Sequence, residues 1–193
     1  MPDESSEASE QVAVERVRAG DRDAYAVLVR LHASSAHRAA VLFGAGPDAE
    51  DVVQTAFVKA YEALPRFRNG APFRPWLLRI VQNEAKNAAR AAARRDGAIK
   101  RYALRDGPPA DASDPVATLL SDERQRELLA AVHALPEPLQ RAIVCRFLLD
   151  LSEQETATVL GCRAGTVKSR VHRALRRLRE QLPEPMREAG NER

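Results

Sequence analysis

The sequence predicts an all-α protein: two small helical bundles joined by a flexible linker, with a helix-turn-helix in the C-terminal bundle. Three observations support this prediction. Alanine, leucine, arginine and glutamate, all good helix formers, dominate the 193 residues. Only 5% of the residues are aromatic, so a large aromatic-rich sheet is not expected. Apolar residues recur at helical spacing on both sides of a stretch rich in proline and glycine, which divides the chain in two.

The first bundle is expected over residues 12–96. Residues 1–11 are polar and acidic, which predicts a disordered acidic tail. Helical patterning begins near Val12 and continues to Phe43. Its expected buried stripe comprises Ala24, Val27, Leu28, Leu31, Ala39 and Leu42.

Two further helices complete this bundle. One starts at Asp48, an N-cap residue followed by carboxylates that favour the helix dipole, and stops at Pro65. The next runs from about Phe73 to Arg95. Helix-breaking residues then predict a linker over 97–120.

The second bundle is expected over residues 121–183, with three or four shorter helices and a tail at 184–193. Ser152 and Glu155 form a capping box that starts a helix, and Gly161 can close it in the left-handed conformation. The helix after the turn has one apolar side and one cationic side, as a DNA recognition helix requires. The candidate contacts to duplex DNA are Arg163, Thr166, Lys168, Ser169, Arg170, His172, Arg173 and Arg176.

This second basic segment, residues 163–179, holds seven Lys/Arg and no acid. A basic amphipathic helix that simply faces solvent is the alternative interpretation. A helix-turn-helix by itself indicates only that DNA is bound.

The first basic segment, residues 66–105, contains eleven Lys/Arg against two acids. Its helix combines cations for phosphates with amides that can bond a base, and the preceding loop sets aromatics among arginines, a composition suited to an unstacked base. The candidate residues are Arg66, Phe67, Arg68, Asn69, Arg79, Asn83, Lys86, Asn87, Arg90 and Arg94. The alternative is a surface helix with core aromatics, and for Trp76 we prefer packing.

No catalytic constellation stands out in the sequence. The four histidines are scattered, and Cys145 and Cys162 match no metal-ligand spacing. We therefore predict no enzyme activity, no metal and no cofactor. Neither a signal peptide nor an apolar run of membrane-spanning length is present, so a reduced, soluble, cytoplasmic protein without membrane insertion is expected.

Three motifs together resemble the extracytoplasmic-function sigma factors. They are DAEDVVQTAF from Asp48 to Phe57, PFRPWLLRIVQN from Pro72 to Asn83, and Leu135-Pro136 with GTVKSRVHRA from Gly165 to Ala174. They stand in the family's order and cover about residues 20–182. The resemblance implies a sigma factor that binds core RNA polymerase, directs it to specific promoters and helps to melt the minus-ten region.

The resemblance also implies partners and roles. The helix that begins at Asp48 would grip the clamp helices of the polymerase's largest subunit. Residues 66–95 would capture a flipped base of the non-template single strand at the minus-ten element. The helix-turn-helix would read duplex promoter DNA at the minus-thirty-five element, with nearby helices facing the flap of the second-largest subunit. The implied core polymerase contacts are Asp48, Glu50, Asp51, Gln54 and Phe57.

Members of the family are commonly held inactive by an anti-sigma factor, so such a partner is expected. In the holoenzyme the protein would be associated with the nucleoid. Two positions depart from the family pattern: Asn87 stands where aspartate is frequent, and Thr156 where isoleucine is usual. The leading alternative is a dimeric helix-turn-helix regulator that acts without core polymerase binding. It explains residues 152–178, but neither the 83–94 face nor the acidic helix at 48–62.

Overall fold

The computed structural model describes residues 4–68, 70–103 and 123–181, and every regular element in these ranges is a helix. The chain divides into two compact units, Met1–Asp111 and Ala112–Arg193. These findings confirm the predicted all-α fold with two bundles. Residues 104–122, which include most of the predicted linker, and the predicted tail at 184–193 lie outside the described residues.

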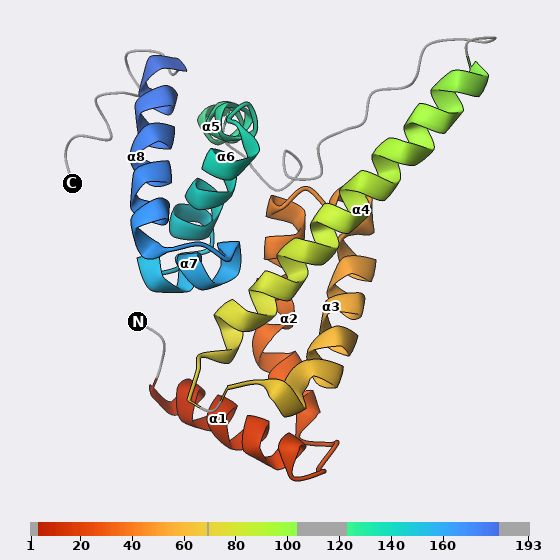
Figure 1. Cartoon of the computed structure of the whole chain (residues 1–193), viewed down its shortest axis with the longest axis vertical. Coiled ribbons are helices and arrows are strands. Elements are labelled where there is room, and N and C mark those ends of the chain that lie inside the picture. The colour runs from red at the N-terminus through yellow and green to blue at the C-terminus, as the bar shows by residue number, and fades with distance from the viewer. Residues whose placement is uncertain (1–3, 69, 104–122, 182–193) are drawn as a thin grey trace. The chain divides into compact units, whose positions relative to one another are not determined.

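The described part of the N-terminal unit is built from α1 (Glu4–Arg18), α2 (Tyr25–Leu42), α3 (Ala49–Ala63) and α4 (Phe73–Ala103). Short 3-10 turns, η1 (Gly46–Asp48) and η2 (Leu64–Arg66), flank α3. Helices α2, α3 and α4 pack on one another, while α1 lies across one end of the bundle against α2 and η2 (Figure 1). The core between them includes the fully buried Leu28, Leu64, Phe73, Leu77, Leu78 and Val81.

The start of the chain corrects the prediction of a disordered tail over residues 1–11, because α1 begins at Glu4. The physical reason lies in Glu10, whose carboxylate contacts His32 of α2 and the backbone of Phe73. These partners are distant in sequence, so composition alone could not reveal them.

A turn separates α1 from α2, where the sequence pattern had suggested continuous helix. Gly20 has φ 101°, a backbone conformation that residues with a side chain rarely adopt. Asp21 accepts hydrogen bonds from the N–H groups of Asp23 and Ala24. The hydrogen bond from Arg16, followed by that from the Ala24 N–H, holds the pKa of Asp21 below its usual value. Leu31, expected in the buried stripe, is 40% exposed.

Helix α4 passes its predicted end near Arg95 and continues through Gly97 to Ala103, beyond the predicted domain boundary at 96. One glycine inside a helix costs only about 1 kcal/mol relative to alanine, which a long flanking helix can offset. Asp48 occupies the N-cap position of α3 but makes no side-chain cap hydrogen bond. Its carboxylate lies 3.4 Å from the guanidinium of Arg95 instead, linking α3 to α4.

The described part of the C-terminal unit contains α5 (Glu123–His133), α6 (Glu137–Ile143), the π-helical turn η4 (Val144–Leu148), α7 (Glu153–Leu160) and α8 (Ala164–Gln181). Helix α8 packs on α5, α6 and α7. The core of this unit includes Val144, Leu151, Val159 and Val167. The prediction of three or four shorter helices is therefore confirmed.

Candidate nucleic-acid interface

The helix-turn-helix forms as its local signals predict. The Glu155 N–H donates to Ser152 Oγ at 3.2 Å, and the Ser152 N–H donates to Glu155 Oε2 at 2.8 Å. Gly161 ends α7 in the left-handed conformation, with φ 62° and ψ 38°. The polypeptide then turns within a few residues, and α8 begins at Ala164.

One side of α8 packs against its unit and the other faces solvent. Val167 and Ala174 are fully buried and Leu178 nearly so, while Val171 and Leu175 are half-buried. Thr166 and Arg170 sit half-buried at the edge of the cationic side. The exposed predicted residues are Arg163, Lys168, Ser169, His172, Arg173 and Arg176.

Phe147 is a surface residue that the sequence did not single out. It lies in η4, is 56% exposed and lines a pocket of about 610 Å³ together with Val171 and Leu175 of α8. Its neighbour Arg146 donates to the carbonyl of Leu151 and so points inward. The stretch from Val144 to Leu151 is mostly apolar, so only packing could identify which of its side chains is exposed.

The predicted polar residues of α4 lie at the surface of the helix. Arg79, Asn83, Asn87, Arg90 and Arg94 are exposed, and Lys86 is half-buried. They recur three or four residues apart and so share one side of the helix.

Glu84, an acid within the basic segment, is withdrawn from this face. Its Oε1 lies 2.7 Å from Lys59 Nζ of α3, and only 14% of its side chain is exposed. The cationic character of the exposed face is therefore not diluted by Glu84.

The loop before α4 corrects the prediction for Phe67. Phe67 is 5% exposed, and its ring centroid lies 4.7 Å from that of Trp76 and 5.9 Å from that of Phe73. Phe67 and Phe73 are therefore core residues that do not offer a ring face to an unstacked base, and the half-buried Trp76 packs against both of them, as expected. Arg66 and Arg68 are exposed, and Asn69 lies outside the described residues.

Glu50, Asp51 and Gln54, three of the residues implied to contact core polymerase, are exposed on α3. Phe57 is wrong as a surface contact: it is 7% exposed, and the Tyr25 hydroxyl donates to its carbonyl at 2.6 Å. Burial of Tyr25 itself raises the pKa of its phenol.

Two exposed large hydrophobic residues of α3 were missed by the sequence prediction. Val58 is 58% exposed and Tyr61 36%. Val58 lies four residues after Gln54 and Tyr61 lies seven residues after it, so both share the face of the helix that carries Gln54. The helical spacing was the available signal, but only burial distinguishes these residues from the core side.

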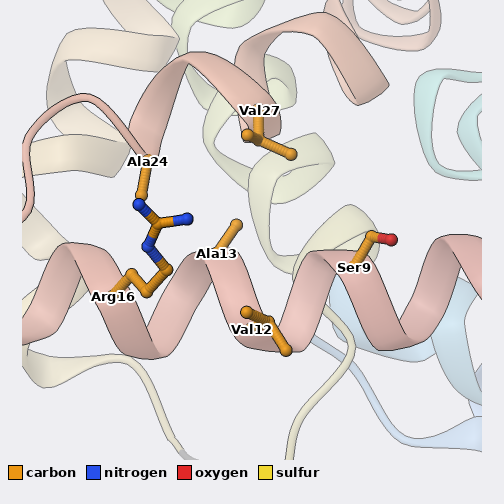
Figure 2. Close-up of a pocket in the computed structure, with 6 residues that line it drawn as sticks. All are labelled: Ser9, Val12, Ala13, Arg16, Ala24 and Val27. Atoms are coloured by element: carbon orange, nitrogen blue, oxygen red, sulfur yellow. The ribbon is translucent and has the colours of Figure 1, made fainter.

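A second pocket lies in the N-terminal unit. A pocket of about 320 Å³ lies between α1 and the start of α2, and apolar and small side chains make up most of its lining (Figure 2). Among the described residues, no group of three or more His, Cys, Asp or Glu could hold a metal ion. No helix in the described ranges is long and apolar enough to cross a membrane.

Comparison with known proteins explains why these two units occur together. Residues 25–95 match the family model of sigma-70 region 2, and residues 125–178 that of sigma-70 region 4. The chain is 37% identical to the ECF RNA polymerase sigma-E factor of Escherichia coli, across 88% of this chain and 92% of that protein. The chain belongs to the extracytoplasmic-function (ECF) sigma factors. It is thus a transcription initiation factor that binds core RNA polymerase and directs it to promoters.

Solved structures agree with this family. The ECF sigma factor superposes on CnrH, in its complex with the cytosolic domain of CnrY, with a TM-score of 0.68 and 26% identity over 90% of this chain and 96% of that one. It superposes on the sigma factor RpoE of Bartonella quintana, in complex with the anti-sigma factor NepR, with a TM-score of 0.59. That match has 27% identity and covers 79% of this chain and 92% of the other.

Proposed function

We propose that this ECF sigma factor meets polymerase and promoter through three surfaces of its own. The observation that carries the proposal is a pair of exposed cationic helix faces, one in each unit, each backed by a buried core. The recognition face comprises Arg163, Thr166, Lys168, Ser169, Arg170, His172, Arg173 and Arg176 of the C-terminal unit. The melting face comprises Arg66, Arg68, Arg79, Asn83, Lys86, Asn87, Arg90 and Arg94. The clamp face comprises Asp48, Glu50, Asp51, Gln54, Val58 and Tyr61 of α3 and its N-cap.

The recognition face reads the duplex minus-thirty-five element from the major groove. Helix α8 is stiffened by its buried back, and its exposed arginines can donate to both N7 and O6 of a guanine. Arg173 Nε donates to the Ser169 carbonyl at 3.2 Å, which orients the guanidinium along the helix. Arginine and lysine at the edges of the face contact phosphates and set the register.

The melting face opens the minus-ten element and holds a base of the non-template strand. Removing a base from the stack costs a few kcal/mol and needs a waiting surface. Asn83 and Asn87 lie four residues apart on the exposed side of α4 and can hydrogen-bond that base, while the arginines neutralise the phosphates. Since Phe67 and Phe73 are buried, the base is received on the exposed side of the loop rather than stacked on these rings.

The clamp face holds the polymerase. It joins carboxylates at the start of α3 with the exposed Val58 and Tyr61, a mixture suited to a partner helix that is both basic and apolar. The exposed Phe147 beside α8 is a further candidate contact, for the polymerase flap. In this scheme the polymerase performs the catalysis in the cytoplasm, and the sigma factor contributes binding energy. An anti-sigma factor, the partner with which RpoE was solved, is a further expected ligand.

Run-off transcription with purified core polymerase tests the three surfaces together. The wild-type chain should initiate from its own promoter. Arg68→Ala should reduce opening, Arg173→Ala should reduce promoter binding, and Asp51→Ala with Gln54→Ala should reduce core binding. Sequence-specific binding to a palindrome with no response to core polymerase would instead support a dimeric regulator and overturn the proposal.

A further inference from the structure

Glu10 of α1 joins three helices of the N-terminal unit. The backbone N–H of Phe73, the first residue of α4, donates to Glu10 Oε1 at 3.0 Å. The second oxygen, Oε2, lies 2.7 Å from Nε2 of His32 in α2. The geometry of that second contact is not that of a hydrogen bond. Both side chains are largely shielded, with 17% of Glu10 and 9% of His32 exposed.

Phe73 needs an acceptor from outside its own helix. The first four N–H groups of a helix have no intrahelical partner, and Phe73 is a fully buried residue, so water is a poor substitute. A carboxylate supplies a charge-assisted hydrogen bond and also favours the positive end of the helix dipole. Glu10 therefore stabilises the start of α4 from a position 63 residues earlier in the chain.

Helix α1 also contacts the segment that precedes the loop before α4. Helix α1 packs against η2, the turn that ends at Arg66 and leads into the loop at residues 67–72 (Figure 1). Within the loop's base, Phe67 packs on Phe73, and the His32 ring lies 5.3 Å from Phe73. Both ends of the loop thus rest on α1 or on residues that Glu10 contacts.

Between Ser9 and Arg18, few apolar side chains of α1 are buried, which increases the importance of this polar contact. Between Ser9 and Arg18 the buried apolar side chains are the small Ala13 and Val14, while Val12 is 54% exposed. Figure 2 shows the pocket between α1 and the segment that carries Ala24 and Val27, with the small Ala13 side chain pointing toward that segment.

We propose that Glu10 is a positioning residue for promoter melting, holding the first turn of α4 in place beside Phe67 and η2 so that Arg66, Arg68 and Asn83 face the non-template strand. This inference rests on the melting face proposed above. Glu10 touches neither DNA nor polymerase in this role. It acts through the Phe73 N–H and through His32.

Three variants of the full chain test the inference: Glu10→Ala, Glu10→Gln, and Glu15→Ala as an exposed control on the same helix. Amide exchange in the free protein should accelerate at Phe73 in Glu10→Ala and stay slow in the control. In holoenzyme, opening is followed by 2-aminopurine fluorescence at the non-template base of the minus-ten element. Glu10→Ala should lower the opening equilibrium about tenfold, the scale of one hydrogen bond to a charged group. Core affinity should stay unchanged.

Rescue separates positioning from general destabilisation. Glu10→Gln keeps an oxygen that accepts the Phe73 N–H, so opening should return to within about threefold of wild type, the remaining deficit reflecting the lost charge. Opening by Glu10→Ala at the wild-type level would overturn the inference. A parallel loss of core affinity and opening, with no rescue by glutamine, would also overturn it by making Glu10 merely structural.

Arg68→Ala and Asn83→Ala distinguish a failure of this inference from a failure of the melting face. If both lose opening while Glu10→Ala does not, the melting face stands and the role of Glu10 is wrong. If both open normally, the melting face is misassigned. A loss confined to Glu10→Ala would then place its action elsewhere and overturn the inference as well.

Discussion

At the scale of single residues, Thr156 places a polar group at a buried position. Its side chain is fully buried in α7, and no described residue bonds its Oγ1. A buried hydroxyl without a partner costs about 1–3 kcal/mol. Stability is therefore lost at the helix that supports the recognition helix.

Thr156→Val should stabilise the C-terminal unit by about 1 kcal/mol, because valine keeps the shape and removes the unpaired hydroxyl. Urea unfolding followed by circular dichroism measures the change. Thr158→Val is the matched control: Thr158 is exposed and its Oγ1 donates to the Gln154 carbonyl, so no gain is expected there. A loss of stability in Thr156→Val would mean that the hydroxyl is satisfied after all.

The two cysteines differ in environment and should differ in chemistry. Burial, the main cause, raises the pKa of the Cys145 thiol from 9.0 to about 12, while the Arg141 charge opposes the rise. Cys162 is half-buried in the turn of the helix-turn-helix. Thiolate is the reactive form, so Cys162 should react first with thiol reagents at pH 8.

The raised pKa of Cys145 also predicts how stability depends on pH. The folded state favours the protonated thiol. The contribution of this preference to the free energy of unfolding is complete below pH 9 and is lost between about pH 9 and 12. Unfolding free energy measured across this range should fall more steeply in wild type than in Cys145→Ala. Equal slopes in the two proteins would show that the thiol does not contribute.

At the scale of elements, α3 shows why a helix pattern locates a face better than it selects residues. Asp51 and Gln54 are exposed, but Phe57, three residues further on, turns inward and Val58 turns outward. Phe57 was selected because it belongs to a motif that resembles the family, but a residue of such a motif can be part of the core. Burial decides which of the shared residues a partner can reach.

Replacing Asp51 and Gln54 by alanine should weaken core polymerase binding about thirtyfold, since interface residues of moderate importance cost about 1 kcal/mol each, or about 2 kcal/mol together. Fluorescence anisotropy with labelled sigma factor measures core affinity, and the same variant should bind a minus-thirty-five duplex as wild type does. Arg30→Ala, an exposed change on α2, serves as the control. Retained core affinity in the double variant would refute the clamp face.

At the scale of the whole molecule, the melting and recognition faces belong to separate compact units with separate cores. A promoter that binds both gains from linkage, because the second contact forms at the effective concentration set by the first. The free energies of individual contacts should nevertheless be independent, since residues without shared partners behave additively.

Arg173→Ala should therefore weaken promoter use by about 1–3 kcal/mol if Arg173 makes a bidentate base contact. Combined with Asn83→Ala, the losses should add within about 0.5 kcal/mol. Binding and opening assays on wild-type and scrambled minus-thirty-five sequences provide the measurement. Equal loss on both sequences would assign Arg173 to a phosphate, and strong non-additivity would show that the faces are coupled.

The sequence by itself determined the all-α class, the two bundles, the capping box at Ser152, the left-handed Gly161 and both cationic faces. Each depends on interactions within a few residues, or on periodicity along one helix, which the order of amino acids encodes directly. The family motifs depend on the same local order.

Only the tertiary structure decided that Phe57 and Phe67 are core residues, that Val58 and Phe147 are exposed, and that residues 4–11 are helical. It also showed Glu10 beside His32 and Phe73. The physical reason is common to all of them. Burial, and the satisfaction of a buried N–H, depend on residues brought together from distant parts of the chain, and no local pattern contains that information.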